Sequence, residues 1–315
     1  MDANSYSRTG GKKTGKSRLP LFILGFFGIG FLLLIVLAVA SLAFEGPLVG
    51  KCVGVVEIEG EITTESVASS MFSDGSYGSY ELGQRISALN SRDEVASVLF
   101  VINSPGGSVV AGDELYRAID SLNKPRVSYF RETAASAAYY IATPTDYIIS
   151  EPNALTGSIG VVMYGYSFGE LAKRLGIEDV VIKSGEMKDI GNPMRNMTEG
   201  ERALLQGAVN EIFENFKDTV RENRGSKLNY ALFAEALDGR VLTGRMALDT
   251  GLVDEVGSRQ DAIIKAAELG GIEYESVEDI ELCEIRTKPE AAGLFDMGTM
   301  IGGVLGSAGE MLKVK

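Results

Sequence analysis

Two short segments of this 315-residue chain place serine and glycine where they could support hydrolytic chemistry. Asn103–Gly107 (NSPGG) follows an apolar run, and its Pro-Gly-Gly turn can present backbone N–H groups to a ligand. Thr133–Tyr139 (TAASAAY) places Ser136 among alanines at the start of an expected helix, where developing negative charge is favoured. Taken singly, each segment is also typical of an ordinary tight turn or of close helix packing.

Two further segments carry a serine and a lysine that could take part in the same chemistry. Thr156–Gly160 (TGSIG) holds Ser158 between glycines, which alone indicates a turn or a bulge. Ser184–Asp189 (SGEMKD) holds Lys188, and most lysines are solvated at a protein surface. The chain contains no histidine, which excludes Ser-His-Asp and Cys-His catalytic units and His-based zinc sites.

A lysine can replace histidine as a base only after it has lost its proton. An ordinary lysine, with a pKa of about 10.4, is almost wholly protonated at neutral pH. Burial that lowers this value by roughly 2–3 units gives a neutral amine, which can accept the proton of an attacking serine hydroxyl. Any acid–base chemistry in this chain must run in such a way, without histidine.

Composition also restricts the partners. Lys and Arg number 30 against 43 Asp and Glu, a formal charge of −13, so we expect no nucleic-acid partner. The two cysteines, Cys52 and Cys283, are too few and too far apart for a metal cluster, and we expect neither a metal nor a cofactor. A disulfide between them is permitted outside the cytoplasm, and nothing else in the sequence indicates it.

The amino-terminal region is predicted to hold a membrane anchor. Residues 1–19 carry five basic side chains and one acidic one, and Leu21–Phe44 is a run of 24 residues without charge. A helix of this length spans about 36 Å, enough for a bilayer, and the basic flank favours a cytoplasmic N-terminus. A cleaved signal peptide is the alternative, because Ala38–Ala40 and Ser41–Ala43 resemble cleavage sites, but its apolar core would be shorter.

Beyond this run, short β-branched segments alternate with helical patterns, which favours a βαβ-based α/β domain with mainly parallel strands. The expected strands are Val53–Glu59, Ala96–Ile102, Arg126–Phe130, Tyr147–Ser150 and Asp179–Lys183. The expected helices are Tyr80–Asn90, Val109–Leu122, Ala134–Ala142 and Gly169–Leu175.

A longer helix is predicted from about Thr198 to Asn223. Thr198 and Glu201 have the spacing of a capping box. The apolar stripe of this helix, which we expect to serve as core or subunit contact, is Leu204, Leu205, Val209, Ile212, Phe213 and Phe216.

The spacing of the polar residues indicates a family. Ser158 and Lys188 follow Ser136 by 22 and 52 residues. In this the chain resembles the signal peptide peptidase family, SppA-type serine proteases that use a Ser–Lys dyad on a ClpP/crotonase-like fold. The resemblance covers roughly residues 53–268. It includes two later signatures, Asp238–Ala247 (DGRVLTGRMA) and Gly251–Gly257 (GLVDEVG).

The resemblance implies a role for each polar segment. Ser136 would be the nucleophile, Lys188 the general base, and Ser158 the residue that orients the lysine amine. The backbone N–H groups of Gly107 and Ala137 would form the oxyanion hole. Family members commonly have Gly-Gly after the serine, whereas this chain has Ala-Ala, whose methyl groups would narrow the adjacent pocket.

The resemblance also implies the fold and its arrangement along the chain. We expect an α/β, ClpP/crotonase-like βαβ superhelical domain preceded by one N-terminal transmembrane helix. The expected parts are a basic cytoplasmic tail (1–20), the anchor (21–44), the protease domain (45–289) and an apolar, glycine-rich tail (290–315). The protein would cross the plasma membrane once, with its catalytic domain outside.

The function implied is a serine endopeptidase that degrades remnant signal peptides, acting as a homo-oligomer tied to the bilayer through residues 21–44. The motif segments offer no pocket carboxylate, so we expect apolar or small substrate side chains. A crotonase-type acyl-CoA enzyme is one alternative, although such enzymes rely on carboxylates and CoA is absent outside the cell. A catalytically inactive oligomeric membrane scaffold of the same fold is the other.

Overall fold

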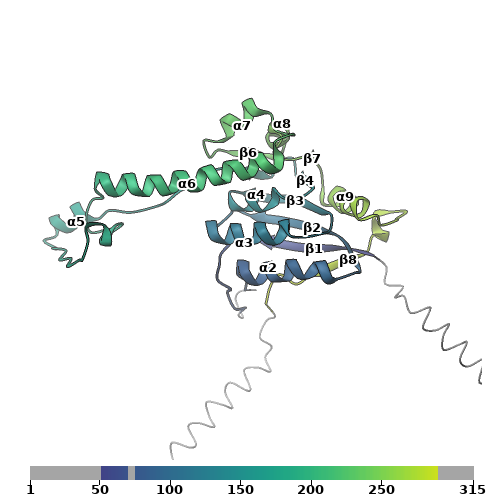
Figure 1. The fold of residues 1–315 in the computed structure, drawn as a ribbon, viewed down its shortest axis with the longest axis horizontal. Coiled ribbons are helices and arrows are strands. Elements are labelled where there is room, and N and C mark those ends of the chain that lie inside the picture. Colours follow the sequence, from purple (N-terminus) through teal and green to yellow (C-terminus); the bar gives the residue numbers. More distant parts are fainter. Residues whose placement is uncertain (1–50, 70–74, 290–315) are drawn as a thin grey trace, which may run out of the picture. The chain divides into compact units, whose positions relative to one another are not determined.

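A single sheet organises the part of the chain that the computed structural model describes, residues 51–69 and 75–289. Its strands lie in the order β6-β5-β3-β2-β1-β8, and β4 joins β3 to β7 (Figure 1). All pairs are parallel except β5 with β6, so the predicted α/β class is confirmed. The strands are β1 (Cys52–Glu59), β2 (Val95–Ser104), β3 (Arg126–Ala135), β4 (Tyr147–Ser150), β5 (Leu155–Gly157), β6 (Val241–Thr243), β7 (Glu255–Val256) and β8 (Leu282–Ile285).

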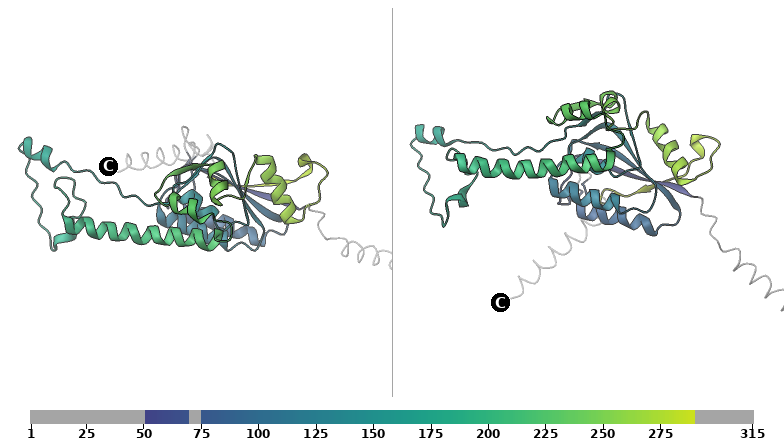
Figure 2. Two further views of the ribbon diagram at one scale, coloured as in Figure 1. Left: turned by 90° about the horizontal axis from the view of Figure 1, so that it is seen from above. Right: turned by 45° about the horizontal axis from the view of Figure 1, so that its top comes forward.

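Helices cover both faces of the sheet (Figures 1 and 2). Helices α2, α3 and α4 contribute to the hydrophobic cluster on one face, and α9 contributes to the cluster on the other. The α-helices are α2 (Ser79–Ala88), α3 (Val109–Asp120), α4 (Ala137–Ala142), α5 (Gly169–Arg174), α6 (Glu199–Arg224), α7 (Tyr230–Ala236), α8 (Gly244–Thr250) and α9 (Arg259–Gly270). Short 3-10 turns are η1 (Leu89–Ser91), η2 (Glu186–Asp189) and η3 (Val277–Asp279).

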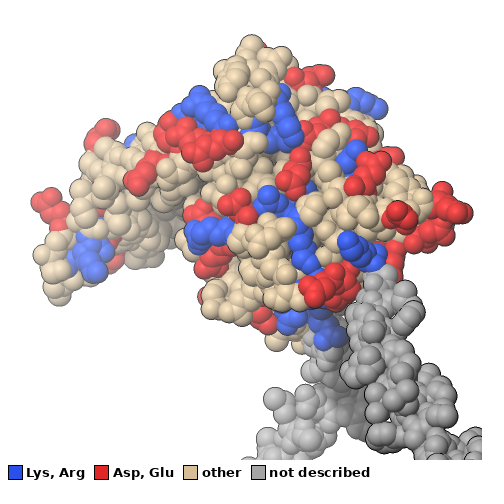
Figure 3. Space-filling view, turned by 45° about the vertical axis from the view of Figure 1, so that its right-hand side comes forward, with Lys and Arg blue, Asp and Glu red and all other residues tan. Residues whose placement is uncertain are grey.

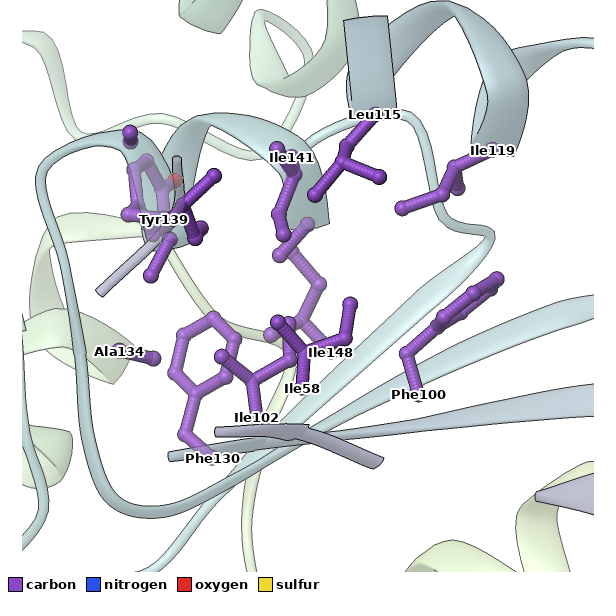
Figure 4. Packing of buried hydrophobic residues seen from close by; sticks show 14 of the residues in the cluster. Ile58, Phe100, Ile102, Leu115, Ile119, Phe130, Ala134, Tyr139, Ile141 and Ile148 are labelled. Atoms are coloured by element: carbon purple, nitrogen blue, oxygen red, sulfur yellow. The ribbon is translucent and has the colours of Figure 1, made fainter. Parts of the chain in front are cut away.

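The central strands are rich in apolar residues because both faces of their middle parts are buried. In β2, Phe100 and Ile102 pack under α3 and α4, whereas Leu99 and Val101 face α9. Figure 4 shows Phe130 and Ile102 of the sheet beneath Leu115 of α3 and other helical side chains. This two-sided burial holds the carboxyl ends of β2 and β3 rigidly next to each other, which matters for the site described below.

The strands predicted at β1 to β4 are confirmed, and two other predictions are corrected. Residues 179–183 form no strand, because no neighbouring strand in the described chain pairs with them and Val180 and Ile182 are exposed. The helix expected from Ala134 begins only at Ala137, since β3 continues through Ala135 and pairs there with β5.

The two cysteines form a disulfide. Cys52 of β1 and Cys283 of β8 are bonded, with their Cα atoms 5.8 Å apart and a sequence separation of 231. The bond joins adjacent parallel strands at the edge of the sheet. It settles the pairing that the sequence left open.

Helix α6 divides into a packed half and an exposed half. Its predicted capping box is confirmed, with reciprocal hydrogen bonds between Thr198 and Glu201. Phe216 and Val220 are buried near its C-terminal end, whereas Leu204 is 57% exposed. The exposed start of α6, together with α5 and η2 that precede it in the chain, extends beyond the sheet (Figure 2). We call residues 161–205 the arm.

Within the described ranges, no helix is long and apolar enough to cross a membrane. The predicted anchor at residues 21–44 and the apolar tail at 290–315 lie outside those ranges. On the face shown in Figure 3, basic and acidic side chains are interspersed.

Candidate active site

Ser136 occupies the sharp junction between β3 and α4. Its backbone adopts φ 55° and ψ −126°, and its N–H donates to the carbonyl of Gly157 at 2.9 Å. Among the described residues, Ser136 and Ser158 are the two non-glycine residues with positive φ. Such backbone conformations cost free energy and gather at functional sites. Strain therefore marks the same two serines that the motifs singled out.

Ser158 follows β5 directly and lies close to Ser136. Strand pairing places Gly157 opposite Ala135, the residues that precede the two serines. The Ser158 N–H donates to the carbonyl of Arg240 at 3.0 Å, which holds its φ at 49°. Both serines are half-buried and line one cavity of about 590 Å³. The structure thus brings together two of the three side chains predicted for the site, Ser136 and Ser158.

The orientation of Gly107 follows from its pairing with Ile62. The Ile62 N–H donates to the Gly106 carbonyl and the Ile62 carbonyl accepts from the Ser108 N–H, each at 2.9 Å. In such a parallel bridge the N–H of the middle residue, Gly107, points the opposite way. Gly107 also lines the cavity with Ser136. Its N–H therefore points away from Ile62 and takes no part in this pairing.

The Pro-Gly-Gly turn is in contact with the β3–α4 junction that carries Ser136, and the packing around this turn requires glycine at positions 106 and 107. A Cβ on Gly107 would lie 1.9 Å from the Ile62 carbonyl oxygen. A Cβ on Gly106, where φ is +106°, would lie 2.9 Å from the Ser136 Cβ and 3.0 Å from the Ala137 nitrogen. Ala137 is the first residue of α4, a position whose N–H has no partner within the helix. The two N–H groups of the predicted oxyanion hole thus lie on touching segments.

Lys188, the remaining predicted site residue, does not lie beside Ser136 and Ser158. It lies in η2 on the arm, its side chain is exposed, and it lines neither of the cavities that contain Ser136. The predicted base and the predicted nucleophile are therefore not assembled within one copy of the described chain.

A network of charges fixes the turn that carries Lys188. Asp189 accepts from Lys183 at 2.6 Å and from Arg195 at 2.9 Å. Arg195 also donates to Glu201, whose side chain is buried at the start of α6. Hydrogen bonds from Arg195 are the main cause that lowers the pKa of Glu201 to about 2. The network therefore stays ionised near neutral pH and holds η2 against α6.

The apolar stripe of α6 has a role that sequence reasoning missed. It was expected as core or subunit contact, and Phe216 does lie in the core. Val209 and Phe213, however, line the cavity that holds Ser136 and Ser158, opposite the segment Leu237–Gly239. The sequence did point to this part of the chain, because Asp238 and Gly239, which also line the cavity, begin the DGRV signature.

Comparison with known proteins identifies the family. The profile of Peptidase family S49 matches residues 118–273, and that of Clp protease matches residues 77–155. Putative protease MJ0651 of Methanocaldococcus jannaschii is 39% identical over 227 residues, which are 71% of this chain and 70% of that protein. The chain belongs to peptidase family S49. The resemblance inferred from the motifs is thereby confirmed.

A second relative and the bounds of the two profile matches add detail. Putative signal peptide peptidase SppA of Enterococcus faecium is 32% identical over 205 residues, which are 64% of this chain and 59% of that protein. The S49 match spans Ser136, Ser158 and Lys188, and the Clp protease match spans Gly107 and Ser136.

One solved structure also aligns with this S49 chain. It is the 1510-N membrane-bound stomatin-specific protease K138A mutant in complex with a substrate peptide, with a TM-score of 0.48 and 19% identity. The alignment covers 80% of this chain and 97% of that one.

Proposed function

We propose that this S49 peptidase is a membrane-anchored serine endopeptidase that degrades remnant signal peptides and other membrane-associated peptides. Ser136 is the nucleophile, Lys188 the general base, and Ser158 orients the lysine amine. One observation carries the proposal: the two strained serines share a cavity with Gly107, whose N–H points away from Ile62. That combination places a hydroxyl beside hydrogen-bond donors for a tetrahedral intermediate.

The proposed reaction proceeds through an acyl-enzyme. The Ser136 Oγ attacks the peptide carbonyl while the neutral Lys188 amine takes the hydroxyl proton. The N–H groups of Gly107 and Ala137 stabilise the oxyanion, and Lys188 returns the proton to the departing amine. A water molecule, deprotonated by Lys188, then hydrolyses the ester and releases Ser136.

The exposed position of Lys188 favours a homo-oligomer in which the base comes from a second copy. The arm carries extended chain outside the sheet on both sides of α5, with large exposed apolar side chains. These residues are Val162, Tyr164, Tyr166, Phe168, Val180 and Ile182. Exposed apolar side chains gathered on one part of a chain are typical of an interaction site. Covering it with another copy would also bury Lys188 and so favour its neutral amine.

The disulfide supports the proposed location. Disulfides persist in oxidising compartments outside the cytoplasm. The Cys52–Cys283 bond lies just after the apolar run Leu21–Phe44 and its basic flank, which would keep the N-terminus inside. Both features agree with a catalytic domain held on the outer side of the membrane.

Peptide cleavage by the detergent-solubilised full chain tests the assignment. We expect Ser136→Ala and Lys188→Met each to lower kcat/KM by at least about a thousandfold, because each removes one half of the dyad. Lys173→Met, which removes an exposed arm lysine paired with Glu170, should leave the rate unchanged.

A serine-reactive phosphonate probe separates this enzyme from the scaffold alternative. Labelling at Ser136 in the wild type, and its loss in Lys188→Met, would support the protease. A folded chain that neither labels nor cleaves any peptide would favour the scaffold. Substantial cleavage by Ser136→Ala or Lys188→Met would refute the dyad.

A further inference from the structure

A second, smaller cavity of about 180 Å³ opens beside Ser136, between α3, α4 and α6. Most of its wall is apolar, formed by side chains that include Val109, Tyr140 and Phe216. Asp113 is the one charged residue among the described residues that line it. The four motif segments do not predict a carboxylate here, because Asp113 lies outside all of them.

Helical spacing explains why Asp113 faces this cavity. Val109, Gly112 and Asp113 all line it, and positions three and four apart share one face of a helix. Gly112 lets α3 approach α4 closely, since a Cβ there would lie 3.3 Å from the Ala137 Cβ. Asp113 and Ser136 thus line the same small cavity.

The charge on Asp113 is not neutralised by any described basic side chain. The structure shows no ion pair for it within the described residues, and its half-buried carboxylate meets the hydroxyl of Tyr140. Burial is the main cause that raises the pKa of Tyr140 to about 12; Thr219 lowers this pKa and the nearby Asp113 carboxylate raises it further, so the hydroxyl beside Asp113 stays protonated. The neighbouring cavity also contains an acidic residue, Asp238, but there Arg240 compensates it at 2.8 Å.

We propose that this cavity receives the substrate side chain on the acyl side of the scissile bond and that Asp113 selects lysine or arginine there. The proposal rests on the proposed function, with Ser136 as nucleophile. The apolar stem of such a side chain would pack against Tyr140 and Phe216, whose rings lie 5.2 Å apart, edge to face. Its cationic head would reach the carboxylate of Asp113 and the amide of Asn215.

This selectivity suits the proposed substrates. A signal peptide carries its basic residues in a short segment directly before the apolar core. A subsite for lysine or arginine next to Ser136 would direct cleavage to the boundary between those two segments. The carboxylate thus replaces the expectation of purely apolar or small side chains with a specific cleavage position.

Matched peptides test the role of Asp113. The full chain in detergent is offered otherwise identical peptides with lysine or norleucine at the cleavage position, since norleucine keeps the stem and lacks the charge. We expect kcat/KM to favour lysine by about tenfold or more, and Asp113→Asn to remove most of that ratio. Asp218→Asn, an exposed α6 carboxylate paired with Arg221, should leave both rates unchanged.

The outcomes separate this inference from the proposed function. If the wild type cleaves neither peptide, the assignment of Ser136 as nucleophile is at fault. If the wild type cleaves both peptides equally, the cationic subsite is refuted and the protease stands. The subsite is likewise refuted if Asp113→Asn, with its melting temperature unchanged, keeps the preference for lysine. A falling ratio in that variant supports the subsite.

Discussion

At the scale of single residues, the site is distinguished by backbone strain. Ser136 and Ser158 have φ values of 55° and 49°, and such a sparsely populated backbone conformation costs a residue with a Cβ about 1–3 kcal/mol. Each is held in place by a hydrogen bond from its N–H, to Gly157 and Arg240 respectively. The fold thus over-determines both conformations, and the hydroxyls are presented from turns rather than from regular strand or helix.

Replacing Ser136 by glycine and by alanine separates strain from chemistry. Both variants lose the nucleophile and should be inactive. Ser136→Gly should be more stable than Ser136→Ala by about 0.5–1 kcal/mol, because relief of the positive φ outweighs the added freedom of the unfolded chain. Equilibrium urea unfolding measures the difference. A glycine variant less stable than the alanine variant would show that Ser136 stores no strain.

The chemistry-bearing residues were predictable from sequence because they sit in short motifs, but their geometry was not. Nothing in the spacing of Ser136 and Ser158 shows that both have positive φ, since that depends on the pairing of β3 with β5. The direction of the Gly107 N–H depends on Ile62, 45 residues earlier in the chain. Asp113 was missed because a single acidic residue on an amphipathic helix usually faces solvent.

At the scale of elements, a buried ion pair fastens α6 to the sheet. The Arg224 side chain is 1% exposed and donates to both carboxylate oxygens of Asp254, at 2.8 and 3.0 Å. Asp254 also accepts from the N–H of Ile148 in β4, and Arg224 donates to the carbonyl of Gly251. The pair therefore locks the packed half of α6, from which the arm extends.

Breaking this pair should be costly. Asp254→Asn leaves the Arg224 charge buried without its partner, so we expect the free energy of unfolding to fall by about 3–5 kcal/mol. Asp218→Asn on the exposed side of α6 should cost less than about 1 kcal/mol. Urea unfolding at pH 7 checks both values. A loss below about 1 kcal/mol for Asp254→Asn would contradict the locking role.

The same pair gives a pH dependence of known sign. Burial disfavours the Asp254 carboxylate, but the interactions with Arg224, Lys227 and the Ile148 N–H together outweigh burial, so the pKa of Asp254 is lowered in the folded chain. The contribution to stability is therefore fully present above the unfolded pKa of about 4 and is lost as the pH falls further. Between pH 5 and 8 it should stay constant in the unfolding measurements above.

Helices and strands could be predicted from sequence where a local residue pattern determines them. They could not be predicted where they depend on pairing with residues far away in the chain. The strands β1 to β4 are apolar runs buried on both faces, and Thr198 with Glu201 caps α6 within four residues. Residues 179–183 have the composition of a strand, but a strand needs a partner, and the described chain offers none. Likewise the disulfide joins cysteines 231 residues apart, a separation that carries no pairing signal.

At the scale of the whole molecule, the two residues proposed as nucleophile and base lie on different parts of the chain. Ser136 sits at the rigid end of the sheet, and Lys188 sits on the arm, in a turn fixed to α6 by Asp189, Arg195 and Glu201. That network resists folding η2 back toward its own sheet, and the exposed apolar side chains of the arm need a cover. An assembly in which each arm serves the next copy would meet both requirements.

Mixing two inactive variants decides between a shared site and a site within one chain. Ser136→Ala keeps Lys188, and Lys188→Met keeps Ser136. When the two are co-expressed in equal amounts, half of the sites have a functional serine and half of those receive a functional lysine. About one quarter of the wild-type rate should then return. Co-expression of Ser136→Ala with a chain carrying both substitutions should restore none, because no functional serine is present. A complete lack of activity in the first mixture, with mixed assemblies verified by differential tags, would place both dyad residues in the same chain and require the arm to move.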